Sequence, residues 1–173
     1  MRCVKLNDEN AIPRATAMAD ASGVEFIVVG GTAAFAHGAS RVTLDLDVVY
    51  RRTKDNLERL ASAVAPLGPY PRGAPPGLPF KWDRRTVGLG TNFTLQTDLG
   101  FIDLLGEITG GGRFEDLLPF AVRLDVYGIS CLCLDLSKLI EVKRAAGRPK
   151  DFEAIAELEL IEEEKRKLDQ GIL

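Results

Sequence analysis

Two acidic residues inside an apolar run constrain this chain more than any other feature. Asp45 and Asp47 lie within Leu44-Asp45-Leu46-Asp47-Val48-Val49, a segment typical of a buried β-strand. A carboxylate in such surroundings is costly unless it is paired or holds a metal ion. Alternate residues of a strand share one face, so the two Cα atoms would lie about 6.5–7 Å apart on one side of a sheet. The segment therefore predicts a metal site.

A glycine pair precedes the two acids. The apolar run from Val24 to Val29 predicts a strand that ends at Gly30-Gly31, and residues 32–37 predict a short helix closed by Gly38. Glycines let the backbone approach a phosphate, and the N–H groups of a following helix point at it. Paired carboxylates hold Mg²⁺, which bridges to substrate phosphates. The pattern favours phosphate-transfer chemistry over its alternative, a turn glycine pair beside two solvated aspartates.

Two further aspartates are candidates to join this pair of acids. Asp103 lies in the apolar run Phe101–Leu105, which repeats the arrangement around the first two acids. Asp98 lies in the turn between predicted strands at 92–97 and 101–105. A turn aspartate usually bonds to backbone. We therefore favour Asp103, with Asp98 as the alternative.

Basic residues gather near the C-terminus. Lys143 and Lys150 are the best candidates for binding a triphosphate or a nucleic-acid backbone, although cations late in a helix also favour the helix dipole. Arg41 is a candidate for contacting phosphate or base, or for pairing with an acid. The Thr32 hydroxyl is a candidate for donating a hydrogen bond to a phosphate, or for capping the helix.

The rest of the chain predicts an α/β (α+β) protein. Further helices are expected at 10–22, from Thr53 to Pro66, from 135 or 137 to 146, and from 150 or 151 to about 170, with a hairpin at 121–133. The proline- and glycine-rich stretch 66–79 is expected to be a surface loop near the cleft. We predict a short mixed β-sheet with packed helices in a core at 1–134, and a helical portion at 135–173 that packs on it in one compact domain.

The composition narrows the function class. The 173 residues carry a net charge of −3, and aromatic residues make up 7%. A plain nucleic-acid-binding module, with its basic surface and stacking aromatics, therefore fits poorly. No apolar run approaches the roughly 20 residues of a membrane span, and no signal-peptide pattern is present. The expected location is the cytoplasm, without a membrane partner.

These motifs resemble the nucleotidyltransferase superfamily with the polymerase-beta-like fold. That superfamily carries a glycine followed by Gly or Ser, an acid-x-acid pair on the next strand and a third carboxylate on a later one. The small bacterial and archaeal branch that contains the AbiEii-type toxins and minimal nucleotidyltransferases is the most similar. The residues that carry this likeness are Gly30-Gly31-Thr32-Ala33, His37-Gly38, Arg41, Thr43, Asp45, Asp47 and the run from Lys143 to Asp151.

The resemblance implies transfer of a nucleoside monophosphate from an NTP such as ATP to a hydroxyl of RNA, for example a tRNA end, or of a protein. It implies two Mg²⁺ ions, with Mn²⁺ as an alternative, and a toxin role with an antitoxin partner; a homodimer is a further expectation. Asp45, Asp47 and Asp103 would be the metal ligands and catalytic residues. Gly30, Gly31, Thr32, Arg41, Lys143 and Lys150 would bind the nucleotide. The rival hypothesis is a non-catalytic relative that binds nucleotide or a partner.

Overall fold

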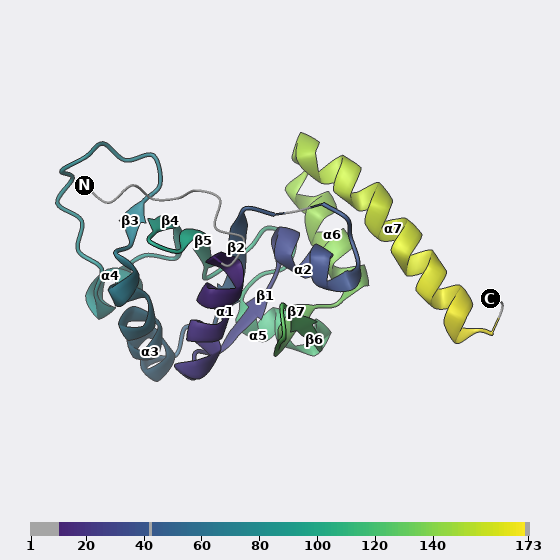
Figure 1. Ribbon diagram of the computed structural model, residues 1–173, viewed down its shortest axis with the longest axis horizontal. Helices are drawn as coiled ribbons and strands as arrows, with labels where there is room; N and C mark the ends of the chain where they lie inside the picture. The colour runs from purple at the N-terminus through teal and green to yellow at the C-terminus, as the bar shows by residue number, and fades with distance from the viewer. Residues whose placement is uncertain (1–10, 42, 172–173) are drawn as a thin grey trace.

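The computed structural model describes residues 11–41 and 43–171, and its centre is a seven-stranded mixed sheet (Figure 1). The strand order is β3-β4-β5-β2-β1-β7-β6. β2 pairs with β5, and β1 with β7, in parallel, while the other neighbours are antiparallel. The strands are β1 Phe26–Val28, β2 Asp45–Tyr50, β3 Tyr70–Pro71, β4 Asn92–Thr97, β5 Gly100–Leu105, β6 Ala121–Val126 and β7 Ile129–Leu134. This confirms the mixed sheet and the α/β class.

Helices pack around the sheet. In Figure 1, α3 and α4 lie beside β3 and β4, whereas α6 and α7 lie toward the other end of the molecule. The α-helices are α1 Ala11–Ala21, α2 Gly30–His37, α3 Lys54–Val64, α4 Arg84–Leu89, α5 Phe114–Leu117, α6 Leu136–Ala146 and α7 Pro149–Asp169, with 3₁₀ turns at Ala65–Leu67 and Leu118–Phe120. The sequence did not predict α4, a helix of six residues. Its N-cap is Asp83, whose carboxylate accepts a hydrogen bond from the Thr86 amide.

The central strands explain why two acids can lie in an apolar run. Leu46, Val48 and Tyr50 are buried on one face of β2, which builds the core. Asp45 and Asp47 alternate with them and face the other way, toward the start of α2. Burial of the apolar set therefore fixes the face on which the acids appear.

The stretch rich in proline and glycine is a surface segment with its own packing. Tyr70, Phe80, Trp82 and Phe93 form a chain of ring contacts with centroid separations of 6.3, 6.4 and 5.3 Å. The Trp82 indole N–H donates to the Ala61 carbonyl of α3 at 3.1 Å. These contacts hold the loop after β3 against the body of the protein.

The C-terminal helices pack on the side of α2. α6 contacts both α2 and α7, and α7 continues beyond the body of the molecule toward the C-terminus (Figure 1). The division at residue 134 stays a prediction. No helix in the described part of the chain is long and apolar enough to cross a membrane.

One buried amide ties the first two strands to α3. Asn56 is fully buried, and its side-chain oxygen accepts from the Glu25 amide at 2.7 Å. Its NH₂ group donates to the carbonyls of Glu25 and Arg51, at 3.0 and 2.8 Å. These three bonds join the segment before β1 to the segment after β2 and so support the pairing of the two strands.

Replacing Asn56 with alanine should destabilise the protein. The change leaves the partly buried Glu25 amide and Arg51 carbonyl without their side-chain partner, which costs about 1–3 kcal/mol. Urea unfolding should give a free energy of unfolding lower by about that amount. An Asn56→Ala protein as stable as the wild type would contradict this account.

Candidate metal and nucleotide site

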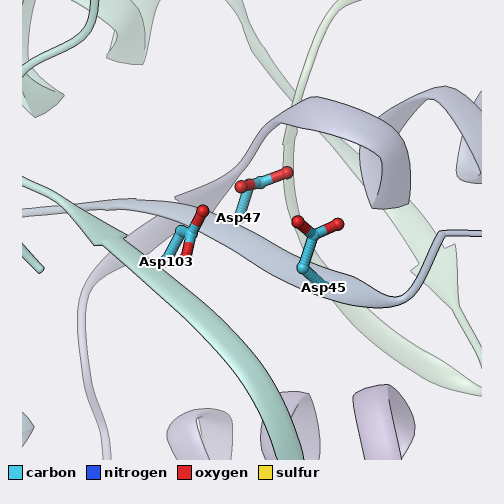
Figure 2. Close-up of side chains that lie close together, drawn as sticks. All are labelled: Asp45, Asp47 and Asp103. Carbon is cyan, nitrogen blue, oxygen red and sulfur yellow. The ribbon is translucent and has the colours of Figure 1, made fainter. Parts of the chain in front are cut away.

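Three aspartates meet on one face of the sheet. Asp45 and Asp47 project from β2 and Asp103 from β5, and Figure 2 shows the three carboxylates close together. One oxygen from each lies within 4.8 Å of the others. Three hard oxygen donors in this arrangement suit a divalent cation such as Mg²⁺. We call these residues the aspartate triad.

The pairing of β2 with β5 assembles the triad. The parallel register sets Asp47 directly beside Asp103, and Asp45 lies two residues earlier on the same face of β2. Asp98 lies instead in the turn of the β4–β5 hairpin, near Gly68. Of the two candidates for the third acid, Asp103 is therefore the one that the fold brings to the pair.

The glycine pair begins α2 rather than preceding it. Gly30 has φ +64°, and a Cβ atom there would lie 2.0 Å from a carboxylate oxygen of Asp47. A Cβ atom at Gly31 would lie 2.7 Å from the Thr43 hydroxyl. Both positions thus require glycine so that the first turn of α2 can approach β2. The helix predicted from the sequence began at Thr32, two residues later than α2, because a pair of glycines is typical of a turn.

Two threonines hold the acid pair in place. The Thr43 hydroxyl donates to Asp45 Oδ1 at 2.8 Å. The Thr32 hydroxyl donates to the Asp45 carbonyl at 3.2 Å, and the Thr32 side chain is fully buried. In this conformation the Thr32 hydroxyl therefore faces β2, rather than a phosphate as the sequence predicted.

A cavity of about 280 Å³ opens beside the triad, between α2 and α7. We call it the α7-side cavity. The first turn of α2 and all three aspartates contribute to its wall. Its basic lining residues are Arg41, Lys143, Arg148 and Lys150. The predicted phosphate-binding residues other than Thr32 therefore lie around one space.

Three of these four basic residues are held in ion pairs with acidic residues of α7. Lys143 is buried and lies 3.5 Å from Asp151, which also pairs with Arg148 at 2.7 Å. Burial alone would raise the pKa of Asp151, but the hydrogen bond from Arg148 and the charges of Arg148 and Lys143 together lower it. Arg41 pairs with Glu153 at 3.1 Å on the surface. Asp151 thus fixes two cations at the wall of the cavity.

A second cavity, of about 340 Å³, meets the triad from another side. We call it the α6-side cavity. Asp47, Asp103, Lys143 and Arg148 border both cavities, whereas Asp45 and Lys150 border only the first. The remaining wall combines apolar and polar side chains: Leu105, Ile108, Leu139, Val142, Asn92, Glu107 and Thr109. Two members of the triad, Asp47 and Asp103, are therefore reached from both cavities, and Asp45 from the α7-side cavity.

Arg72 is the residue that sequence reasoning missed. It follows β3, and its Nη2 lies 2.6 Å from Asp103 Oδ1, while Nη1 lies 3.9 Å from Asp45 Oδ2. The sequence offered only the expectation that the loop at 66–79 lies near the cleft. The pairing of β3 with β4 brings Arg72 to the triad, and no local motif encodes that pairing.

Crowding of the acids perturbs their ionisation. Burial, and then the charges of Asp45 and Asp103, raise the pKa of Asp47 to about 7. Lys150 and the Gly31 amide oppose this shift. Burial also raises the pKa of Asp103, against the charge of Arg72. A bound cation would offset the burial and the neighbouring charges that raise the pKa values of Asp47 and Asp103.

Comparison with known proteins agrees with this geometry at the level of the fold. The solution structure of the antibiotic-resistance factor ANT(2'')-Ia, an aminoglycoside nucleotidyltransferase, is similar with a TM-score of 0.55. The two chains share 14% identity, over 94% of this chain and 93% of the other. No protein-family model and no curated protein matches the chain. The chain thus shares its fold with ANT(2'')-Ia, and the likeness to the AbiEii-type branch rests on the sequence motifs alone.

The raised pKa of Asp47 predicts a pH dependence of stability in metal-free protein. Between about pH 4 and pH 7 the folded state binds the Asp47 proton and the unfolded state releases it, so stability falls as pH rises through this window. The slope from this group is at most about 1.4 kcal/mol per pH unit. Urea unfolding in EDTA at pH 5.5 and 7.5 should show a smaller difference for Asp47→Asn than for wild type.

Asp98→Asn is the matched control for that comparison, because it removes a carboxylate outside the triad. It should keep the wild-type difference between the two pH values. Parallel wild-type and Asp47→Asn profiles would contradict the assignment of the titration to Asp47.

Proposed function

We propose that this protein transfers a nucleoside monophosphate from an NTP to an acceptor hydroxyl. The observation that carries the proposal is the aspartate triad beneath the glycine start of α2, with basic residues around the same cavity. A nucleotidyltransferase fold with this site supports the same reaction class. Fold alone would not carry the proposal, because one fold hosts many activities.

The carboxylates of Asp45, Asp47 and Asp103 would hold Mg²⁺, or Mn²⁺ in its place. The donor set fits, because all three groups are hard oxygen ligands and their crowding calls for added positive charge. When bound, two such ions stabilise the attacking and leaving oxygens of an in-line displacement. The protein's own part is to position the substrates and to move the proton.

The α7-side cavity is the proposed NTP site. The N–H groups at Gly30 and Gly31, at the start of α2, and the side chains of Lys150 and Arg148 would bind the triphosphate. Lys143, held by Asp151, would add positive charge from the wall. Arg41 would contact the outer end of the nucleotide on leaving Glu153.

The acceptor would enter through the α6-side cavity, which meets the triad at Asp47 and Asp103. The acceptor oxygen forms a bond to the α-phosphorus while the bond from that phosphorus to the bridging oxygen breaks. Pyrophosphate leaves with the bonding electrons. Asp103 accepts the proton of the acceptor hydroxyl and passes it to water.

The motif likeness to the AbiEii-type branch extends the proposal to the biological role. The acceptor would be RNA, such as a tRNA end, or a protein, and the enzyme would be a cytoplasmic toxin restrained by an antitoxin. Incubation with each α-³²P-labelled NTP, Mg²⁺, total RNA and cell protein tests this directly. Label in RNA or protein supports it, and absence of label from both, with transfer to a small hydroxyl compound, contradicts this acceptor class.

Loss of either β2 acid should abolish transfer without unfolding the protein. Asp45→Asn or Asp47→Asn removes part of the metal-dependent stabilisation of transition-state charge, worth several kcal/mol, so the rate should fall by about 10²–10³-fold. The readout is label transfer at saturating NTP, with circular dichroism to confirm folding. Asp98→Asn, on the hairpin but outside the triad, should keep wild-type activity.

The rival hypothesis is a non-catalytic relative that binds nucleotide or a partner. Calorimetry separates the two, because it detects NTP binding whether or not turnover follows. Metal-dependent NTP binding with no transfer to any acceptor would favour the rival. Full activity in both Asp45→Asn and Asp47→Asn would overturn the proposed mechanism.

A further inference from the structure

Arg72 is bound at the edge of the triad by three different contacts. Its guanidinium donates to Asp103 Oδ1 at 2.6 Å and lies 3.9 Å from Asp45 Oδ2. The guanidinium carbon lies 4.4 Å from the centre of the Phe101 ring, a cation–π contact. Since Phe101 is two residues before Asp103 on β5, the ring and the carboxylate together set the plane and position of the guanidinium.

Placing Arg72 here leaves one of its buried nitrogen atoms without a hydrogen-bond partner. Among the described residues, its Nε is the one buried side-chain polar atom without a hydrogen-bond partner. Leaving a buried donor unsatisfied costs about 1–3 kcal/mol. The side chain nevertheless stays in place, so its contacts with Asp103, Asp45 and Phe101 outweigh that cost.

The backbone of Arg72 is fixed from outside the site. Its amide donates to the Thr94 carbonyl of β4 at 2.9 Å. Two residues earlier, the Tyr70 hydroxyl donates to the Pro75 carbonyl at 2.6 Å and accepts from the Leu78 amide at 2.9 Å. The loop after β3 therefore presents Arg72 to the triad from a braced position.

We propose that Arg72 is a positioning residue for Asp103, the third member of the triad. It holds Oδ1 of that carboxylate and so leaves Oδ2 directed toward the ion and the acceptor hydroxyl. The inference rests on the proposed function only in taking the triad as a divalent-metal site. Partners that hydrogen-bond a ligating carboxylate fix its orientation, and their loss typically costs about 10–100-fold in metal affinity or activity.

A counter-ion role makes a different prediction from a positioning role. A counter-ion needs only a positive charge near the acids, which lysine also supplies. Positioning needs the planar fork of arginine, whose two nitrogens reach Asp103 and Asp45 while its face lies on Phe101. Arg72→Lys keeps the charge and removes this geometry, so it isolates the proposed role.

The test is Mn²⁺ binding, followed by electron paramagnetic resonance, in wild type, Arg72→Lys, Asp103→Asn and the double variant. Arg72→Lys should bind Mn²⁺ about tenfold more weakly or worse. The double variant should bind no more weakly than Asp103→Asn alone, because Arg72 acts through that carboxylate. Arg84→Lys, whose partner Glu58 lies outside the site, is the matched control and should bind as wild type does.

Turnover supplies a second readout. When turnover is measured by label transfer, Arg72→Lys should lower kcat by about tenfold or more and leave the KM for NTP within about twofold of the wild-type value. Thermal unfolding near the wild-type midpoint excludes loss of fold as the cause. Wild-type Mn²⁺ affinity in Arg72→Lys overturns the inference, as does a defect in KM alone.

These outcomes separate the inference from the proposed function. A wild-type protein that binds Mn²⁺ but transfers no label contradicts the proposed function, while weaker Mn²⁺ binding by Arg72→Lys still supports the inference. If the wild type transfers label and Arg72→Lys binds Mn²⁺ as tightly as the wild type does, the proposed function is supported and the inference is contradicted. A wild-type protein that binds no Mn²⁺ at the triad overturns both.

Discussion

The mutual repulsion of three carboxylates is the constraint on which the rest of the site depends. Asp47 and Asp103 are adjacent across the parallel β2–β5 pair, and Asp45 shares their face. Partial burial strengthens the repulsion, since fewer waters screen it. Positive charge offsets this repulsion, and the chain supplies it from Lys143, Arg148 and Lys150 at the α6–α7 junction and from Arg72 after β3.

The surrounding structure brings those positive charges and the start of α2 close to the triad. The two glycines let α2 start against β2, where side chains would collide with Asp47 and Thr43. Asp151 fixes Lys143 and Arg148 at the wall of the α7-side cavity. Two cavities then meet at Asp47 and Asp103, which suits the proposed reaction between two substrates.

Local patterns predicted most of the elements and the triad, but not everything that surrounds it. Alternation of apolar residues with Asp45 and Asp47 fixed their face, and the same logic identified Asp103. The register that sets Asp103 beside Asp47 joins residues 56 positions apart, which no local pattern encodes. Arg72 was missed for the same reason, because its place depends on how β3 pairs with β4. The hydrogen bond from the Thr32 hydroxyl to the Asp45 carbonyl is likewise a tertiary contact, which the local pattern around Thr32 does not encode.

In the proposed function, the triad and the α7-side cavity together hold a metal-bound nucleotide. Anomalous diffraction can show this in crystals grown with Mn²⁺ and an NTP analogue whose α–β bridge cannot be cleaved. We expect Mn²⁺ peaks among Asp45, Asp47 and Asp103, with the triphosphate at the start of α2 beside Lys150 and Arg148. A nucleotide bound elsewhere, with no Mn²⁺ at the three aspartates, would contradict it.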